Sequence, residues 1–584
     1  MTEEFINKLR NKNIYLDVED NELIVDAPKG ILDDFTIEEL KANKRWIIDF
    51  INSKNIKKTS VNQIQKAPLK ENYPLSSAQK SFWIMSELNE NAIFNNQSRE
   101  VLHKNDFDSK ALEYSLHYLI ERYEVLRTVF KKDAEGEVKQ YILEPHFLKF
   151  SIDYKDLNIC SDKKAALNTS LKEELFKPFD LSQGPLFRLT VYFYEDLVLI
   201  SQTIHHIISD RWSMLIFEKE LLQVYNSFIK GNLNPLTPLK IQYADYSVWE
   251  EKAAKSDYYF SGKAFFDNQF SGTLPILEFP VDKIRPKQRS HKGRKFARMI
   301  DTALLNNLKL ISKTNGGTLY VGLLTVVNIL IHKHTNQTDI IIGFPISGRD
   351  NVELEDQLGV FMKTLGLRTQ FDKDDNFESL FASVKDIFFE TLKYSDFPFD
   401  EFINELKHQR DIRKGSVFDL IVVLQNQNVN GEVNLNSKNK EGFLDILTNQ
   451  DGNVFSIMDL EFYFVEVEDG LVLNLIYNED VFNHETIIQL SNHFEQILQY
   501  VINQPSVPIM DIDYLTEQEK TKLLTEFNKK NKSFSNEHTF IELFKDVVSL
   551  YPDKPALIYD NEIFTYKDID QNSTKITKII KNLN

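Results

Sequence analysis

The feature that most constrains this sequence is an alternation of strand-like and helical patterns from residue 73 to about residue 504. Residues 186–191 and 197–203 are short apolar runs typical of strands, whereas residues 111–122 and 213–228 carry apolar side chains at helical spacing. The alternation predicts a mixed α/β body. Its length of roughly 430 residues exceeds what one hydrophobic core usually holds, so we expect the body to divide.

Composition narrows the class of protein. Hydrophobic residues make up 42% of the 584-residue chain, which is enough for packed cores and excludes wholly disordered classes. The formal net charge of −18 would repel a phosphate backbone, so we expect no nucleic-acid partner. The single cysteine, Cys160, cannot form an internal disulfide, which suits a cytoplasmic protein.

No segment predicts insertion in a membrane or secretion. Residues 1–10 interrupt their apolar positions with charged ones and lack the apolar core of a signal peptide. The longest apolar stretch, residues 319–331, is shorter than the roughly 20 residues that a membrane span needs. We expect it to be a buried helix, with no membrane partner.

The first 52 residues predict a small module of helix, hairpin and helix. Helical spacing covers residues 3–12, and a capping-box pattern at Thr36 and Glu39 starts a second helix that runs to about residue 50. Asp20-Asn21 is a turn between two alternating runs, and residues 28–30 close the second run.

Polar segments separate the remaining parts. Residues 53–71 are Lys-rich with few apolar anchors, and a second polar stretch lies near residues 516–536; both predict linkers. We expect a module at 1–52, a linker at 53–71, a body at 72–505, a linker at 506–536 and a short α/β segment at 537–584.

The chemistry-bearing motif of the body is His205-His206 with Asp210 four residues beyond. It follows an apolar strand pattern and precedes a helical one, a position from which a rigid element can direct an imidazole into a cleft. Histidine titrates near neutral pH and can therefore accept a proton from an amine or a hydroxyl group. Two adjacent histidines with one in a core are also common, so the motif alone is weak.

Other chemistries have less support. Adjacent side chains on a strand point to opposite faces, so His205 and His206 do not easily reach one metal ion, and we expect no metal. No G-x-S-x-G elbow is present, and Cys160 has no charge pattern that would activate it as a nucleophile.

Seven blocks in order make the body resemble the condensation domains of non-ribosomal peptide synthetases. They are residues 73–83 (YPLSSAQKSFW), 121–130 (ERYEVLRTVF), 205–210 (HHIISD), 243–249 (YADYSVW), 342–349 (IGFPISGR), 359–365 (GVFMKTL), and the stretch from Arg410-Asp411 to Gln425-Asn426. The blocks extend over most of the body, which makes an accidental match negligible.

The resemblance implies a fold and a reaction. The fold is α/β, with two lobes like chloramphenicol acetyltransferase subunits in a V-shaped pseudo-dimer, expected at residues 72–245 and 246–505. Upstream and downstream carrier domains deliver substrates on 4'-phosphopantetheine to a tunnel between the lobes, and this chain itself binds no cofactor. The amine of a downstream aminoacyl group attacks an upstream acyl or peptidyl thioester. The implied catalytic residues are His206 and its neighbour His205, while Asp210 and Arg349 pair structurally.

Three positions depart from the family pattern. Arg211 replaces a glycine, so a turn suited to φ > 0 or to a close backbone approach carries a long cation. Tyr123 replaces a histidine and Lys363 replaces an asparagine, and each either lines the cavity or merely packs. With Ser209 and Trp212, these three residues are the tunnel candidates.

The flanks also resemble synthetase parts. Residues 1–52 are similar to small docking domains, which implies capture of the C-terminal segment of an upstream subunit; an appendage without a partner remains the alternative. The docking residues that this resemblance implies lie on the hairpin and its closing turn, namely Ile14, Leu16, Val18, Leu23, Val25 and Lys29. Residues 537–584 are similar to the opening of an adenylation domain, and no carrier domain with a serine attachment site is visible. For the body, an ester-forming enzyme and a catalytically silent recruitment platform stay open beside amide formation.

Overall fold

The computed structural model divides the chain into two compact units, residues 1–514 and 515–584, which are described separately. The residues that it describes are 15–19, 22–26, 40, 44, 64–88, 93–104, 107–233, 235–253, 256–286, 290–408, 417, 420–425, 453–467, 469–528, 538–559 and 562–583.

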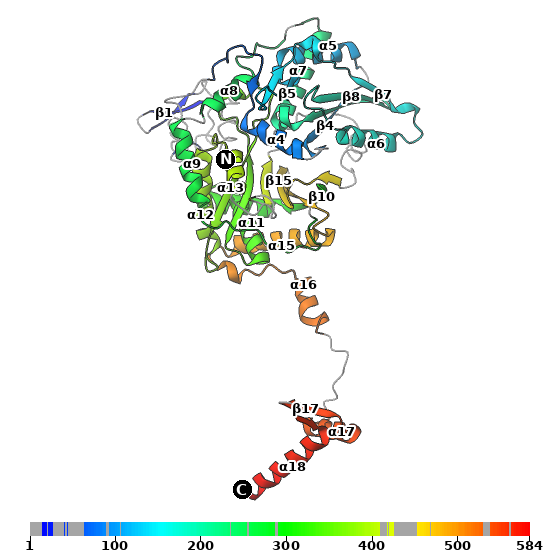
Figure 1. The fold of residues 1–584 in the computed structure, drawn as a ribbon, viewed down its shortest axis with the longest axis vertical. Helices are drawn as coiled ribbons and strands as arrows, with labels where there is room; N and C mark the ends of the chain where they lie inside the picture. Colours follow the sequence, from blue (N-terminus) through cyan, green and yellow to red (C-terminus); the bar gives the residue numbers. More distant parts are fainter. Residues whose placement is uncertain are drawn as a thin grey trace. The chain divides into compact units, whose positions relative to one another are not determined.

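The first lobe of the larger unit is built on a four-stranded sheet in the order β4 (Asn96–Lys104), β9 (Leu197–His205), β8 (Phe187–Tyr194) and β7 (Asp153–Asp156). Helices α5 (Ser109–Arg122) and α7 (Arg211–Ile229) bury apolar residues in the main core of this lobe. Helix α6 (Lys163–Phe176) lies near this sheet (Figure 1). Its buried leucines form a separate small cluster with residues of β8 and β9. A second sheet joins β3 (Tyr73–Pro74), β6 (Val138–Ile142) and β5 (Thr128–Lys132).

The second lobe contains a seven-stranded mixed sheet. Its order is β12 (Lys363–Gln370), β11 (Asp339–Ile346), β13 (Leu420–Gln425), β15 (Leu460–Val467), β16 (Gly470–Asn478), β10 (Lys292–Asp301) and β14 (Asn453–Phe455). Its core also takes in α9 (Asp257–Gln269), α10 (Thr302–Thr314), α11 (Leu319–Thr335), α12 (Phe377–Lys393), α13 (Phe399–His408) and α15 (His484–Asn503). The two separate cores explain why so long a body folds as two lobes.

The predicted elements of the body are confirmed. The expected helices at 111–122 and 213–228 are α5 and α7, and the expected strands are β8 and β9. The apolar stretch 319–331 lies within α11, where Thr318 caps the N-terminus and residues 321–332 are buried. No single helix in the described ranges is long and apolar enough to cross a membrane; α10 and α11, bent by 103°, meet the length and composition criteria only as a pair.

The N-terminal hairpin is confirmed as β1 (Tyr15–Glu19) and β2 (Glu22–Asp26), with Leu16 opposite Val25 and Val18 opposite Leu23. The docking residues Ile14 and Lys29 and the turn at residues 20–21 lie outside the described residues. So do the expected helices at 3–12 and 36–50, except for residues 40 and 44, which are helical.

Two expected boundaries differ from the packing. Ile64 is only 2% exposed and belongs to the core of the first lobe, and Ala67 N–H donates to Asp245 at 2.6 Å, so the second half of the expected linker 53–71 is part of the body. The expected lobe boundary at 245/246 lies inside α8 (Tyr243–Ala253). Tyr243, Tyr246 and Trp249 of this helix all pack on the first core, so the packing changes from one lobe to the other only after α8.

The smaller unit contains α16 (Glu517–Thr521), α17 (Phe540–Leu550), the hairpin β17 (Pro555–Tyr559) and β18 (Glu562–Thr565), and α18 (Tyr566–Leu583). Capping boxes at Thr516 and Thr539 begin the first two helices. Many of its apolar side chains are exposed, including Phe540, Ile541, Leu550, Ile558 and Ile580.

Candidate active site

The histidine pair lies at the end of a buried strand. Strand β9 ends at His205, His206 begins a short 3-10 turn that ends at Ile208, and Asp210 is the N-cap of α7. The site is therefore a strand, a tight turn and a helix start within seven residues. Because both flanking elements are packed in the core, the turn holds its side chains in fixed directions.

His206 is buried and weakly held by hydrogen bonds. Its ring stacks on Phe82 of α4 (Ser77–Leu88) with centroids 4.4 Å apart, and its Nδ1 makes no hydrogen bond within the described ranges. Burial lowers the pKa of His206, against the opposing effects of Asp210 and of the backbone of His206 and Ser209. The imidazole is therefore neutral near pH 7 and able to accept a proton.

His205 has a different environment. Its Nδ1 accepts a hydrogen bond from Ile207 N–H at 3.1 Å, and its ring lies edge-on to Phe179. Burial, followed by His206 and Arg188, lowers the pKa of His205 to about 3. His205 thus stays neutral and uses a ring nitrogen in a hydrogen bond within the turn.

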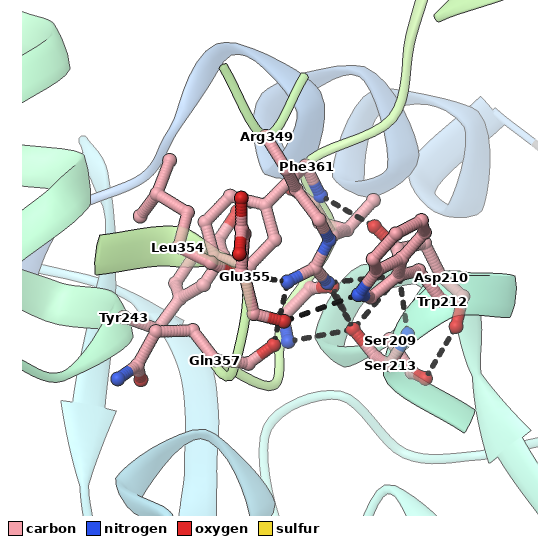
Figure 2. A network of polar contacts seen from close by, with 12 residues as sticks. Ser209, Asp210, Trp212, Ser213, Tyr243, Arg349, Leu354, Glu355, Gln357 and Phe361 are labelled. Atoms are coloured by element: carbon pink, nitrogen blue, oxygen red, sulfur yellow. Dashed lines mark hydrogen bonds and ion pairs between the residues drawn. The ribbon is translucent and has the colours of Figure 1, made fainter. Parts of the chain in front are cut away.

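Asp210 organises the helix start and joins the two lobes (Figure 2). Its Oδ1 accepts from Ser213 N–H at 2.7 Å and from Arg349 Nη2 at 3.1 Å, and its Oδ2 accepts from Phe361 N–H at 3.0 Å. Burial raises the pKa of Asp210, but Arg349 and the two N–H groups outweigh it, so the pKa lies below its ordinary value. The expected pairing of Asp210 with Arg349 is present.

Arg349 begins a segment, residues 349–361, that connects β11 and β12 of the second lobe but packs on the first lobe. Its Nη1 donates to the carbonyls of Leu354 at 2.5 Å and Gln357 at 2.7 Å (Figure 2). Three further residues of the first lobe and of α8 hold the segment. Trp212 Nε1 donates to the carbonyl of Glu355, Tyr123 OH to that of Asp356, and Tyr243 OH to that of Val360.

Tyr123 and Trp212 are thus fixed by packing and hydrogen bonds. Tyr123 is fully buried, and its hydroxyl also donates to Glu220 at 2.8 Å. The side chain of Tyr123 therefore packs inside the protein and does not line a cavity. Ser209 is buried as well, with its hydroxyl 3.2 Å from the carbonyl of Asp210.

Lys363 is half of a buried ion pair. Its Nζ lies 3.0 Å from Glu250 Oε1, and Glu250 also accepts from Ser77 N–H at 2.7 Å and from Tyr246 OH at 3.1 Å. Burial lowers the pKa of Lys363, but Glu250 and Asp396 outweigh burial and raise it. The cation that replaces the family's asparagine therefore packs against a carboxylate and joins β12, α8 and α4.

Arg211 is the first residue of α7 and takes helical backbone, so the expectation of a turn with φ > 0 is wrong at this position. The first position of a helix has ordinary negative φ and needs no glycine, which is why arginine is accepted there. Its side chain is exposed.

Sequence reasoning missed three residues of the site. Phe82 lies within the first family block but carried no chemical signal, and Glu250 follows the fourth block by one residue. Ser213 had a readable signal, because an aspartate before a helical pattern is a candidate N-cap and accepts from the backbone N–H two or three residues on. In the described part of the chain, no group of three or more His, Cys, Asp or Glu side chains could hold a metal ion.

Comparison with known proteins agrees with this geometry. Residues 69–524 match the condensation domain family, and residues 2–52 match the TubC N-terminal docking domain. Gramicidin S synthase 2 from Brevibacillus brevis is 31% identical over 539 residues, which are 91% of this chain and 12% of that protein. Tyrocidine synthase 3 from Brevibacillus parabrevis is 29% identical over 520 residues, which are 89% of this chain and 8% of that protein. The chain thus spans about a tenth of the length of these curated relatives.

Solved structures show the same fold. The X-domain from teicoplanin biosynthesis aligns over 78% of this chain and 100% of its own, with a TM-score of 0.67 at 22% identity. The first condensation domain of the calcium-dependent antibiotic synthetase aligns over 76% of this chain and 99% of its own, with a TM-score of 0.59 at 16% identity. A two-lobed α/β fold with a histidine pair at the end of β9 defines the condensation-domain class, and this chain belongs to that family. Its N-terminus carries a docking domain.

Proposed function

We propose that this chain forms an amide bond between two carrier-bound substrates, with His206 as the catalytic residue. The observation that carries the proposal is the state of His206: a buried, neutral imidazole whose Nδ1 has no hydrogen bond in the described structure, at the end of a condensation-domain strand. His205 is a positioning residue, because its ring nitrogen is used to hold the turn.

In the proposed reaction, the α-amine of the downstream substrate attacks the carbonyl carbon of the upstream thioester. A C–N bond forms, the C–S bond breaks, and the thiol leaves with the proton that the amine loses. His206 accepts that proton or orients the amine during attack. Holding the two reactants together is worth up to about 7–11 kcal/mol and general-base catalysis about 3–5 kcal/mol, so positioning contributes most of the acceleration.

The proposed partners follow from family membership. Upstream and downstream carrier domains supply the substrates on 4'-phosphopantetheine, and the docking domain binds the C-terminal segment of an upstream subunit. The hairpin β1–β2 supports docking because a two-stranded sheet leaves edge strands that can pair with an extended peptide.

We further propose the domain limits. The docking domain covers residues 1–52, and the condensation domain begins near residue 64 rather than 72, with its lobe boundary just after α8. Residues 506–536 form a linker, and residues 537–584 begin an adenylation domain. The exposed apolar side chains of α17, β17 and α18 support the last proposal, because such surfaces are normally covered by other parts of a domain.

Amide transfer between paired loaded carriers tests the function. Replacing His206 by Ala should reduce amide formation by about 10²–10⁴-fold, the range of a general base. The same substitution at the exposed His117 is the matched control and should leave transfer unchanged. An acceptor carrier loaded with a hydroxy acid distinguishes ester formation. A wild-type chain that transfers to neither acceptor would refute the proposal in favour of a recruitment platform.

A further inference from the structure

Phe82 is the aromatic side chain that lies against the candidate base. Its ring stacks on the ring of His206 with an interplanar angle of 20° and centroids 4.4 Å apart. Phe82 is half-buried and packs on the core of the first lobe, so it keeps water from one face of the imidazole. Because His206 Nδ1 makes no hydrogen bond among the described residues, the orientation of the imidazole depends on packing of this kind.

Helix α4 places Phe82, and the first turn of this helix is fixed locally. Ser76 Oγ accepts from Gln79 N–H at 3.1 Å, and Gln79 Oε1 accepts from Ser76 N–H at 3.1 Å, which together form a capping box. Phe82 follows Ser77, the first residue of α4, by five positions, or about 7.5 Å along the helix axis. The position of the first turn therefore determines the position of the Phe82 ring.

A carboxylate from another helix also holds the first turn of α4. Glu250 of α8 accepts from Ser77 N–H at 2.7 Å and from Ser77 Oγ at 2.8 Å. The first N–H groups of a helix have no partner within the helix and carry a partial positive charge, so a carboxylate is stabilising there. Glu250 is only 8% exposed, which limits competition from water. These two hydrogen bonds join α4 to α8.

The second lobe fixes Glu250 in turn. Lys363 of β12 lies 3.0 Å from Glu250 Oε1, and its Nζ also donates to the carbonyl of Asp396 at 3.2 Å. Burial raises the pKa of Glu250, but Lys363 and the hydrogen bonds from Ser77 outweigh burial and lower it. Glu250 is therefore ionised at neutral pH and contacts the second lobe and α4 at the same time.

We propose that Phe82 is a positioning residue for His206, and that Glu250 sets its position through the first turn of α4. The inference rests on the proposed function, because it assigns the residues that hold the base of that reaction. Lys363 connects the arrangement to β12, so a cation of the second lobe helps to place the base of the first.

Replacing Phe82 by Leu removes the stacked ring and keeps an apolar side chain. The imidazole remains but is less well aligned, so kcat for amide transfer between loaded carriers should fall about tenfold, with KM changed less than about twofold. Phe82→Tyr keeps the ring and should restore kcat. Phe150→Leu is the matched control and should leave kcat unchanged, because half-buried Phe150 packs on the same core and stacks on Phe187 at 4.6 Å and 20°.

The pKa of His206 is a second readout that does not require transfer. Nuclear magnetic resonance of the full chain, with histidine labelled at Cε1, follows the titration, and His206→Ala identifies the signal. Burial lowers this pKa and Asp210 opposes burial, while the neighbouring His205 stays neutral. Phe82→Leu admits water, so the midpoint should rise towards the ordinary value of 6.5. Phe82→Tyr and Phe150→Leu should leave it unchanged.

A double-mutant cycle tests whether Glu250 acts through Phe82. Glu250→Gln removes the charge at the start of α4, while Tyr243 OH, 2.8 Å from Ser76 Oγ, keeps the first turn attached. The substitution should lower kcat per folded protein about threefold or more in the wild type and much less in the Phe82→Leu background. Lys80→Ala is the control on the same helix and should leave kcat unchanged, because Lys80 pairs with Glu401 at an exposed site.

The outcomes that contradict the inference are separate from failure of the proposed function. An unchanged His206 midpoint in Phe82→Leu, or a loss of kcat that Phe82→Tyr does not restore, would refute the positioning role while transfer by the wild type stands. Equal effects of Glu250→Gln in both backgrounds would refute the link through α4. A wild-type chain without transfer would refute the proposed function, and the titration of His206 would still decide whether Phe82 controls the imidazole.

Discussion

At the scale of the residue, the imidazole of His206 stays neutral because burial outweighs the attraction of Asp210. The carboxylate oxygens of Asp210 accept hydrogen bonds from Ser213, Arg349 and Phe361. Asp210 therefore acts on His206 only through its charge. Packing therefore orients the His206 ring, and the Phe82 ring stacks against one of its faces. The site thus combines a neutral imidazole held by packing with a carboxylate whose oxygens are used in hydrogen bonds within the protein.

The neutral state of His206 predicts the pH dependence of transfer. Because its pKa lies below the ordinary value of 6.5, the ring becomes protonated only at a more acidic pH. Amide transfer should therefore be constant near neutral pH and fall as the pH decreases, with a midpoint below 6.5. A pH–rate profile measures this, with circular dichroism at each pH as the control for unfolding. A midpoint at or above 6.5 would contradict the assignment.

At the scale of the element, the segment 349–361 carries contacts that hold the lobes together. Gly359 allows the segment to pass the ring of Tyr243: its φ is +152°, and a Cβ there would lie 1.9 Å from a ring carbon. Leu354, Leu358 and Phe361 of the same segment are buried in the core of the first lobe. The absence of a side chain at Gly359 therefore allows residues 349–361 to pack on the first lobe.

Gly359→Ala should consequently be far more damaging than an ordinary glycine substitution. The Tyr243 ring must move, and overpacking of this kind costs roughly 1–3 kcal/mol or more in addition to the backbone strain. Gly272→Ala is the control, because Gly272 also has positive φ, of +69°, but no atom lies within 4 Å of the added Cβ. Chemical denaturation measures both variants, and equal midpoints would refute the steric account.

The buried pair of Lys363 and Glu250 is a second contact between elements. Lys363→Met leaves the Glu250 carboxylate buried without its cation and should cost about 3–5 kcal/mol. Glu250→Gln in the same chain removes the stranded charge and should recover part of that loss. A double-mutant cycle on the free energy of unfolding measures the coupling, and additive effects would show that the pair is not coupled.

At the scale of the whole molecule, the larger unit has two main cores, and a network around Asp210 and Arg349 links them. The side chains of this pair are only 4% and 2% exposed, so solvent does not screen their interaction. The network lies beside the candidate active site. The attachment of one lobe to the other and the position of His206 therefore depend on the same ion pair.

Asp210→Ala should destabilise the larger unit by about 3–5 kcal/mol, because it strands the Arg349 guanidinium. Lys393→Ala provides the comparison, since Lys393 pairs with Glu390 on an exposed helix surface, where such pairs are worth roughly 0–1 kcal/mol. Denaturant unfolding distinguishes the two. A similar small effect of both variants would show that the buried pair does not link the lobes.

The sequence by itself determined what depends on local order along the chain. Hydrophobic periodicity predicted α5, α7, β8, β9 and α11, because amphipathic spacing is a property of neighbouring residues. The ordered blocks identified the family, the histidine pair and the pairing of Asp210 with Arg349.

Only the tertiary structure decided matters that depend on residues far apart in the chain. Whether Tyr123 and Lys363 line a cavity or pack depends on Glu220 and Glu250, which are 97 and 113 positions away. The burial of Ile64 and the packing of residues 349–361 on the first lobe likewise arise from contacts with other parts of the body. The different environments of His205 and His206, on which their proposed roles rest, arise from burial and hydrogen bonding in three dimensions, which no local pattern encodes.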